Sequence, residues 1–294
     1  MNKLYLVISF LLLFTFPALS KQDLKITWAL SDSPPTYISN HSNMSNRGTC
    51  DALMNHLIDA MPDVRHEVTI LPQSRIGKMM DEGNKICYPC MIHRIQNTSR
   101  ATYSLPAYLY PAISVITSKK LAPHLTKLYG NPIDIEKLMS NKKIQYGRQN
   151  ARKYTKELQP IVENSLAYKR SIVNFNFKDS ATVLFDLLKL KRIDYFTDYP
   201  VTATYHKKIG YKNIEVIPIK QLESAFTLGA VGCATSAADS FAINAISKID
   251  KALQKTVLKA PNYTTTLNYW LSESMPNYLD QYNQNILKSA SYSN

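Results

Sequence analysis

Apolar and polar positions alternate in a strand–helix–strand order along the first third of the chain. Short apolar runs rich in β-branched and aromatic residues predict buried strands, and Leu53, Leu57 and Met61 recur at the spacing of a helix. Helices that alternate with strands are typical of a parallel sheet covered by helices. The predicted strands are 24–30, 66–72 and 86–92, and the predicted helices are 50–62 and 73–83, the second closing at Gly83.

A second α/β unit is predicted after Thr117. Its strands are 141–147, 172–177, 193–199 and 215–219, and its helices are 150–164, 179–192 and 200–210. An apolar run at 223–233, a long helix over 237–258 and a helix near 264–273 complete the pattern. Neither an internal repeat nor a low-complexity linker separates the two units, so the sequence predicts that strands join them directly.

The N-terminus has the pattern of a secretory signal peptide over 1–20. Lys3 precedes an apolar stretch at 4–16, and Ala18 and Ser20 stand at the −3 and −1 positions of a cut after Ser20. This stretch is shorter than the about 20 residues that span a bilayer, so an uncleaved anchor is the less favoured alternative. We expect an exported protein that begins near Lys21 and resides in the periplasm.

Composition narrows the class further. The chain has 294 residues with 35 Lys and Arg against 22 Asp and Glu, a formal net charge of +13. A chain of this length buries a core without needing a metal. Export argues against nucleic acid as the partner of the basic charge, which then reflects a solvated surface, attraction to anionic envelope surfaces or an anionic ligand.

Four cysteines suggest one or two disulfides in an oxidising compartment, with three complete pairings open. Cys87 and Cys90 have CxxC spacing but lie in a predicted strand, whereas a redox pair normally opens a helix. We therefore expect a structural disulfide that uses Cys87 or Cys90, with Cys50 as the favoured partner.

Sequence motifs of common hydrolases and nucleotide-binding enzymes are absent. No GxSxG, HExxH, GxGxxG or Walker A pattern occurs, and Ser140–Lys143 matches SxxK without its companion motifs. No metal or other cofactor is expected.

Several segments together resemble the family-3 extracellular solute-binding proteins, the polar amino acid receptors of ABC importers. The matching segments are ITWALSDSPPTYI (26–38), GTCDALMNHL (48–57), SRATYSLPAYLYPAISVIT (99–117), KRIDYFTDYPV (191–201) and GCATSAADSFAINAISKIDKAL (232–253). The resemblance implies the type II periplasmic-binding fold: α/β, with two lobes, each a mostly parallel sheet flanked by helices, joined by two hinge strands. It places lobe 1 at 21–113 plus 228–294 and lobe 2 at 114–227. The hinges fall near 113–117 and 226–230.

The resemblance also implies a ligand site between the lobes. Arg100 takes the role of the arginine that binds the ligand carboxylate, with Arg94 as the alternative, because a guanidinium matches two carboxylate oxygens. Asp198 is the candidate for the ligand ammonium, Tyr37 for an aromatic cover, and Asp32 for a supporting carboxylate. The same site takes in Ser99, Asn150 and Arg152. Asp51 is a helix N-terminal carboxylate, and Asp194 is expected to be structural.

The expected function is a periplasmic receptor that closes on a small zwitterionic or anionic solute and serves a membrane permease or a sensor protein. The stretch at 148–152 contains two arginines where the family has a Gly-Thr-rich turn, which favours a more anionic ligand. One alternative is a sensory or interaction protein on the same fold that binds no small molecule. Another is a dehydratase, for which Glu157 and Glu223 are the only candidate acids. We expect a monomer, no enzymatic activity and no nucleic-acid partner.

Overall fold

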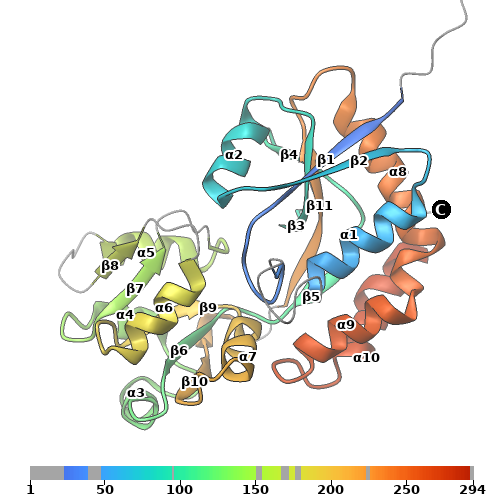
Figure 1. Cartoon of the computed structure of the whole chain (residues 1–294). Coiled ribbons are helices and arrows are strands. Elements are labelled where there is room, and N and C mark those ends of the chain that lie inside the picture. The colour runs from blue at the N-terminus through green and yellow to red at the C-terminus, as the bar shows by residue number, and fades with distance from the viewer. Residues whose placement is uncertain are drawn as a thin grey trace, which may run out of the picture.

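Two β-sheets flanked by helices make up the protein, as the computed structural model shows (Figure 1). The structure describes residues 23–38, 48–94, 96–149, 154–166, 172–175, 180–222 and 226–291. Each sheet with its helices is called a unit below: the first unit contains the start and the end of the described chain, and the second unit contains its middle.

The sheet of the first unit has the strand order β2-β1-β3-β11-β4, and β5 also pairs with β11. Its strands are β1 (Lys25–Leu30), β2 (Arg65–Ile70), β3 (Ile86–Ile92), β4 (Ala101–Tyr103), β5 (Tyr108–Tyr110) and β11 (Thr227–Ala234). β1, β2 and β3 are parallel, and β11 runs antiparallel to β3, β4 and β5.

The sheet of the second unit has the order β10-β6-β9-β7-β8. Its strands are β6 (Ser114–Ser118), β7 (Tyr146–Gln149), β8 (Ile172–Phe175), β9 (Tyr195–Asp198) and β10 (Ile214–Pro218). β7, β8 and β9 are parallel, whereas β6 is antiparallel to both β9 and β10. Read from β8, this sheet repeats the design of the first: three parallel strands, then one antiparallel strand that arrives from the other unit.

Helices cover both sheets. The first unit has α1 (Thr49–Ala60), α2 (Gln73–Asp81), α8 (Phe241–Lys255), η2 (Val257–Lys259), α9 (Pro261–Leu271), α10 (Tyr278–Tyr282), η3 (Asn283–Leu287) and α11 (Lys288–Ser291). The second unit has α3 (Ala122–Tyr129), α4 (Ile135–Ser140), α5 (Leu158–Leu166), α6 (Ser180–Lys189), α7 (Pro200–Lys208) and η1 (Lys220–Leu222). None of the helices in the described part of the chain is long and apolar enough to cross a membrane.

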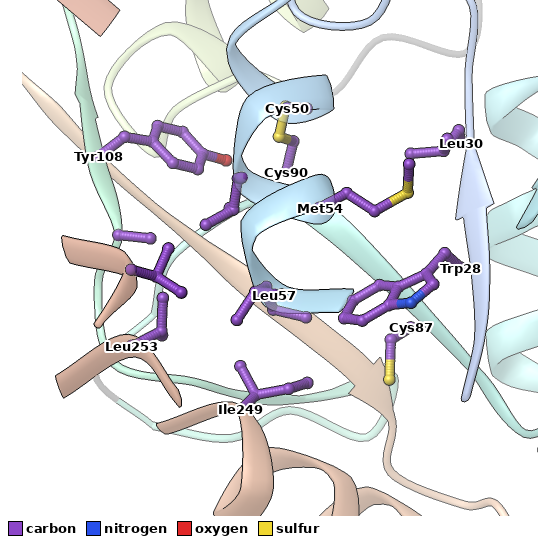
Figure 2. Packing of buried hydrophobic residues seen from close by; sticks show 14 of the residues in the cluster. Trp28, Leu30, Cys50, Met54, Leu57, Cys87, Cys90, Tyr108, Ile249 and Leu253 are labelled. Carbon is purple, nitrogen blue, oxygen red and sulfur yellow. A yellow bond between two sulfur atoms is a disulfide. The ribbon is translucent and has the colours of Figure 1, made fainter. Parts of the chain in front are cut away.

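Each unit has its own hydrophobic core. In the first unit Leu57 of α1 faces Ile249 and Leu253 of α8, with Trp28 of β1 beside them (Figure 2). In the second unit the core gathers apolar side chains of β6, β9, α3, α4 and α6. Helix α7 contributes to both cores, because Val201 packs into the first and Ala203 into the second.

Two disulfides tie β3 into the first unit. Cys90 is bonded to Cys50 at the start of α1, and Cys87 is bonded to Cys233 on β11. The predicted Cys50 disulfide is therefore confirmed with Cys90 as its partner. Cys87 and Cys233 stand directly opposite each other in the antiparallel ladder.

The two-sheet α/β prediction is confirmed, and the sheets are mixed. The helix predicted over 150–164 begins only at Leu158, and residues 154–157 form coil and turn. Pro160 lies in the first turn of α5, where the missing N–H of proline costs no hydrogen bond. Helices α3 and α4 were not predicted, because both are short and α3 lacks a side-chain cap.

Candidate functional site

The carboxyl ends of the parallel strands in both sheets adjoin the passage of the chain between the units. Residues 111–113 lead from β5 into β6, and Ser114 at the start of β6 pairs with Asp198 at the end of β9. In the first unit, Gly229 near the start of β11 pairs with Ile92 at the end of β3. Ligands of α/β sheets bind beyond the carboxyl ends of strands. These two adjacent edges therefore form the candidate site.

Three polar side chains gather after β1 in the first unit. Asp51 in the first turn of α1 accepts the backbone N–H of Gly48 at 2.8 Å and of Ile38 at 3.1 Å. Burial raises its pKa to about 6, with a smaller contribution from the charge of Asp32. Burial, followed by the charges of Asp51 and Asp32, also raises the pKa of Tyr37. The structure thus brings two of the predicted site residues, Asp32 and Tyr37, near each other.

Asp32 has an unusual position within this group. Its Oδ1 atom is buried and accepts no hydrogen bond from any described residue. A buried acceptor without a donor costs about 1–3 kcal/mol. A ligand that donates a hydrogen bond to this atom would recover that free energy.

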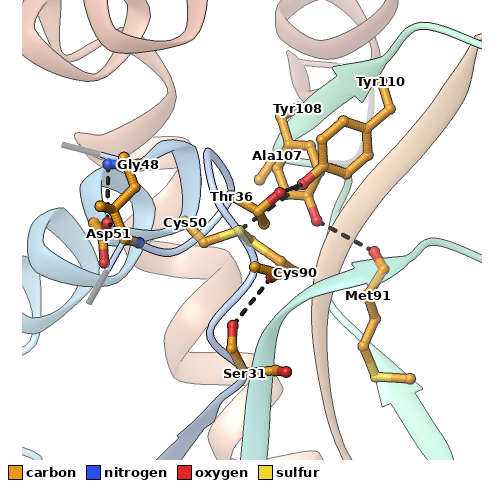
Figure 3. Close-up of a disulfide and its surroundings, with 12 residues drawn as sticks. Ser31, Thr36, Gly48, Cys50, Asp51, Cys90, Met91, Ala107, Tyr108 and Tyr110 are labelled. Atoms are coloured by element: carbon orange, nitrogen blue, oxygen red, sulfur yellow. Dashed lines mark hydrogen bonds between the residues drawn. A yellow bond between two sulfur atoms is a disulfide. The ribbon is translucent and has the colours of Figure 1, made fainter. Parts of the chain in front are cut away.

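The Cys50–Cys90 disulfide holds the start of α1 against β3 (Figure 3). Gly48, immediately before α1, is needed for the close approach, since a Cβ there would lie 2.5 Å from the carbonyl oxygen of Thr36. Tyr110 of β5 donates from its hydroxyl to Thr36 Oγ1 at 3.4 Å. The loop after β1, the start of α1 and the ends of β3 and β5 are therefore one connected structure.

Tyrosines line the junction between the units. The ring of Tyr110 lies 4.8 Å from that of Tyr108 and stacks at 4.9 Å on Tyr199, which belongs to the second unit. Tyr88 of β3 belongs to the same cluster, because its pKa is raised by burial and then by Tyr110 and Tyr199. Burial likewise raises the pKa of Tyr108 and Tyr110. All of these hydroxyls are neutral at physiological pH.

Arg148 is the cation at the carboxyl end of the second sheet. It stands two residues after Tyr146 on β7, so both side chains share a face. Tyr146 on that face is fixed by Tyr154 at 2.9 Å and by Thr197 at 2.8 Å, both measured between hydroxyl oxygens. The Nε atom of Arg148 is buried and donates to no described residue. It is the counterpart of Asp32: the second unit has an unpartnered donor, and the first unit has an unpartnered acceptor.

Asp198 ends β9 and stands just before α7. It is 3% exposed, and its carboxylate accepts the N–H of Tyr199 at 2.6 Å. The positive end of the helix dipole stabilises a carboxylate here. Asp198 therefore lies at the carboxyl edge of the second sheet, next to the passage between the units.

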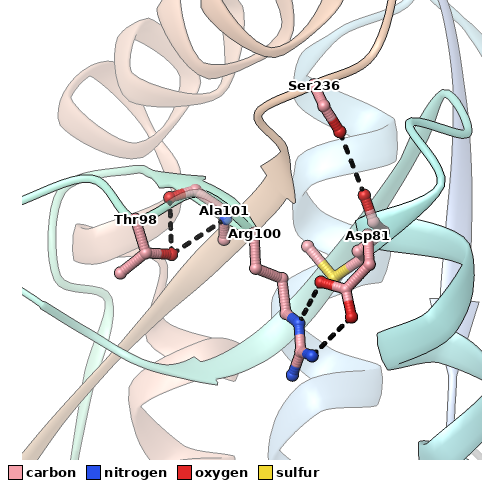
Figure 4. Close-up of polar contacts among 6 residues, drawn as sticks. Asp81, Thr98, Arg100, Ala101 and Ser236 are labelled. Atoms are coloured by element: carbon pink, nitrogen blue, oxygen red, sulfur yellow. Dashed lines mark hydrogen bonds and ion pairs between the residues drawn. The ribbon is translucent and has the colours of Figure 1, made fainter.

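The two arginines predicted for the ligand carboxylate lie at different ends of the first sheet. Arg94 is exposed and follows β3 at its carboxyl end. Arg100 and Ser99 precede β4, at the opposite end, because no described residue between β3 and β4 is helical and the connection runs back along the sheet. Arg100 donates to both carboxylate oxygens of Asp81 at 2.7 and 2.6 Å (Figure 4). The ligand role of Arg100 stays a prediction, and in this arrangement its guanidinium is occupied by Asp81.

The other predicted residues either lie outside the described ranges or have contacts elsewhere. Asn150, Arg152 and Glu223 lie outside the described residues. Glu157 is exposed beside Lys156, and Asp194 accepts the N–H of Gln145 at 2.7 Å, a structural contact. No group of His, Cys, Asp and Glu in the described ranges is arranged to hold a metal ion.

Contacts away from the candidate site also join the units. Lys207 of α7 forms an ion pair with Glu273 at 3.2 Å, and the Tyr205 ring lies 5.9 Å from Trp270 of α9. Lys208 lies 4.5 Å above the ring of Tyr269. Because α7 begins directly after Asp198 and Tyr199, this helix connects the candidate site to α9.

Sequence reasoning missed Arg148 and the tyrosine cluster. Arg148 begins the stretch 148–152, of which only Asn150 and Arg152 were predicted to belong to the site. The two-residue period of β7 would have placed Arg148 on the same face as Tyr146. The tyrosines come from β3, β5 and the end of β9. No local pattern in the sequence brings these three segments together.

No family model matches the chain, and no curated protein matches it in sequence. Solved structures match it across most of its length. An ancestral arginine-binding protein bound to glutamine is 16% identical, with a TM-score of 0.58, over 84% of this chain and 96% of that one. A histidine kinase sensor domain with similarity to periplasmic binding proteins is 12% identical, with a TM-score of 0.58, over 85% and 96%.

An ancestral amino acid-binding protein, a precursor of cyclohexadienyl dehydratase, is 13% identical, with a TM-score of 0.58, over 84% and 94% of the two chains. Most of the similar structures are amino acid-binding proteins by name, and they share the two-sheet α/β fold described above. The chain therefore has the fold of the type II periplasmic binding proteins.

Proposed function

We propose that the protein is an extracytoplasmic receptor that closes its two units on a small zwitterionic or anionic solute. Binding that contacts both units at once stabilises the closed form, since the open form satisfies only half of the contacts. The solute class is that of an amino acid with an additional acidic group or of a related carboxylate.

The observation that carries the proposal is the pair of unpartnered polar atoms at the two carboxyl edges. Asp32 Oδ1 accepts from no described group in the first unit, and Arg148 Nε donates to none in the second. An ammonium suits the carboxylate and a carboxylate suits the guanidinium. A zwitterion is the simplest small molecule that satisfies both atoms.

Further charges favour an anionic solute. Arg94 follows β3 at the same edge as Asp32, so two arginines, one from each unit, adjoin the site. The buried tyrosines at the junction remain neutral and offer hydroxyl donors or ring faces. Asp198 is the second acceptor for an ammonium in this proposal.

Export and a membrane partner belong to the same proposal. The signal peptide pattern at 1–20 and the two disulfides favour an oxidising compartment such as the periplasm. Solved structures of this fold include an amino acid ABC transporter protein and a histidine kinase sensor domain. The closed receptor would therefore engage either an importer or a sensor.

The test is a thermal-shift screen of the chain from Lys21 against amino acids, dicarboxylates and phosphorylated metabolites. At about 1,000 times Kd a ligand stabilises the folded state by ~4 kcal/mol. For a chain of this size that corresponds to a rise in Tm of roughly 8–16 °C. Calorimetry then gives the affinity of the strongest solute for each variant.

Arg148→Gln and Asp32→Asn are expected to abolish the shift, each by removing one end of the solute's contacts. Arg100→Gln is the matched control, because it removes an arginine that Asp81 already occupies. Loss of binding in Arg100→Gln with full binding in Arg148→Gln would move the carboxylate site to Arg100. A flat screen of the folded protein would favour the ligand-independent sensory alternative, and turnover of prephenate would favour the dehydratase.

A further inference from the structure

We propose that the end of the second unit at the amino ends of its parallel strands is a docking surface for an anionic phospholipid bilayer. It is called the basic end and consists of residues 118–121, 141–145, 186–194 and 209–215. The proposal concerns a surface remote from the solute site and does not rest on the proposed function.

The strand directions bring these four segments to one end of the sheet. β6 is antiparallel to β9 and β10, and β7 is parallel to β9. The residues that follow β6 and those that precede β7, β9 and β10 therefore all lie at the end opposite the carboxyl edge. Figure 1 shows α3, which follows β6 directly, on the side of the second unit away from the first.

Hydrogen bonds connect the four segments into one surface. Lys119 N donates to Asn213 O at 3.4 Å, and Thr117 Oγ1, just before the first segment, donates to Asp194 O at 2.7 Å. Asp194 N donates to Gln145 O at 2.8 Å. The hydroxyl of Tyr211 donates to Asp186 at 2.6 Å.

This surface is strongly basic. It carries eight cations, all exposed: Lys119, Lys120, Lys142, Lys143, Lys189, Lys191, Arg192 and Lys212. Its acidic residues are Asp186, Asp194 and Glu215. Asp186 already binds Tyr211, and Asp194 binds the N–H of Gln145. The surface therefore presents a net positive field to solvent.

Two large aliphatic side chains protrude among these cations. Leu190 is 67% exposed between Lys189 and Lys191, and Ile209 is 42% exposed at the end of α7. Aliphatic side chains within a basic surface are typical of proteins that lie on membranes, where lysines attract anionic headgroups and the aliphatic groups enter the interface.

The residue types favour a bilayer over a protein partner or a specific anion. Seven of the eight cations are lysines, which act as point charges, whereas arginine is preferred for paired contacts to carboxylates and phosphates. Protein interfaces are centred on Trp, Tyr and Arg. The basic end has one exposed arginine, and its single aromatic residue, Tyr211, is only partly exposed.

The test is sedimentation of the chain from Lys21, which contains every described residue, with vesicles of phosphatidylcholine with and without phosphatidylglycerol. We expect binding only to the anionic vesicles, weakening from low salt to about 0.15 M ionic strength. The variant Lys189→Gln/Lys191→Gln/Arg192→Gln is expected to bind about 100-fold more weakly, at roughly fivefold for each of the three cations. Leu190→Ser should weaken binding with the charge unchanged.

The matched control is Lys251→Gln/Lys255→Gln/Lys259→Gln, which removes the same charge from exposed positions of the first unit. It is expected to bind anionic vesicles within about threefold of the wild type, because these lysines lie far from the proposed surface. An equal loss in the control would mean that total charge alone acts and would overturn the proposal. Failure of the folded wild type to bind anionic vesicles at low salt would also overturn it. Circular dichroism confirms that each variant is folded.

Discussion

The two units share one strand order but differ in the charges around the amino ends of their parallel strands. In the first unit four cations around the amino ends of the parallel strands are paired with acidic side chains. Lys85 pairs with Asp239 at 2.6 Å, Arg100 with Asp81 at 2.6 Å and Lys25 with Glu67 at 2.6 Å, and Lys248 pairs with Asp63. The corresponding end of the second unit has eight cations and three acids.

This difference locates the basic charge of the chain. Residues 114–227 carry 20 Lys and Arg against 10 Asp and Glu, so most of the +13 net charge belongs to the second unit. Because the two sheets have the same topology, the folding pattern does not demand the asymmetry. The basic end, with eight cations against three acids, carries five of the ten excess positive charges of this unit.

The units also differ in their covalent restraints. Both disulfides described by the structure lie in the first unit, where they attach β3 to α1 and to β11. Both tryptophans, Trp28 and Trp270, lie in the first unit as well. Tryptophan fluorescence therefore reports mainly the unfolding of this unit.

The largest expected effect comes from removing the disulfide between β3 and β11. Cys87→Ala/Cys233→Ala opens a covalent loop with a sequence separation of 146 residues and is expected to lower the free energy of unfolding by about 2–5 kcal/mol. Urea unfolding followed by tryptophan fluorescence measures the loss, and hydrogen exchange assigns it to a unit. An equal loss of protection in the second unit would contradict the division into two separately restrained units.

Acidification is expected to affect the two units with opposite sign. Burial raises the pKa of Asp51 and Asp250 in the first unit to about 6, so the folded state there binds protons that the unfolded chain releases. The first unit therefore gains stability as the pH falls from above 6 towards 4. Burial lowers the pKa of His206 in the second unit to about 4 from 6.5. The unfolded chain then binds the proton first, and the second unit loses stability as the pH falls from 6.5.

Each of these pKa shifts corresponds to as much as roughly 3 kcal/mol. Tryptophan fluorescence in urea at pH 7 and pH 5 measures the first unit, and hydrogen exchange corrected for its intrinsic pH dependence measures the second. Asp250→Asn is expected to reduce the gain of the first unit, and His206→Phe the loss of the second. A change of the same sign in both units would disprove the assignment of these groups.

A glycine-to-alanine substitution in each sheet tests how tightly that sheet is packed. An added Cβ on Gly229 of β11 would collide with the ring of Tyr108, whereas one on Gly147 of β7 would meet the methyl ends of Ile193 and Leu184. A fixed ring yields less than the end of a flexible side chain, and overpacking costs about 1–3 kcal/mol. Gly229→Ala is expected to destabilise more than Gly147→Ala in calorimetric unfolding. The reverse order would show that the second unit is the more rigid.

The smallest effect is expected from the Arg100 ion pair. Asp81→Asn removes a partner whose side chain is 49% exposed, so the free energy of unfolding should fall by less than about 1 kcal/mol. Solute affinity should stay unchanged in this variant. A tighter solute complex after Asp81→Asn would show that the released guanidinium of Arg100 reaches the ligand.

The sequence predicts most helices and strands. It does not predict the direction of the strands or the positions of the side chains that define the site. The helices around Leu57 and Ile249 follow from their apolar period, and the strands at Trp28 and Phe196 from their composition. A strand has the same alternation in both directions, so the antiparallel course of β6 and β11 was not predictable. The resemblance of 99–117 to the solute-binding proteins placed Arg100 in the site, but the non-helical connection after β3 takes it to the other end of the sheet. Cys233 was one of several open partners, because its pairing depends on the register of β11.

The central claim is that one solute bridges Asp32 in the first unit and Arg148 in the second. Small-angle X-ray scattering with and without the strongest solute from the screen tests it most directly. We predict that saturating solute lowers the radius of gyration of the wild type and leaves that of Arg148→Gln unchanged at the same concentration. Solute that binds the wild type with no change in the radius of gyration would contradict closure of the two units around it.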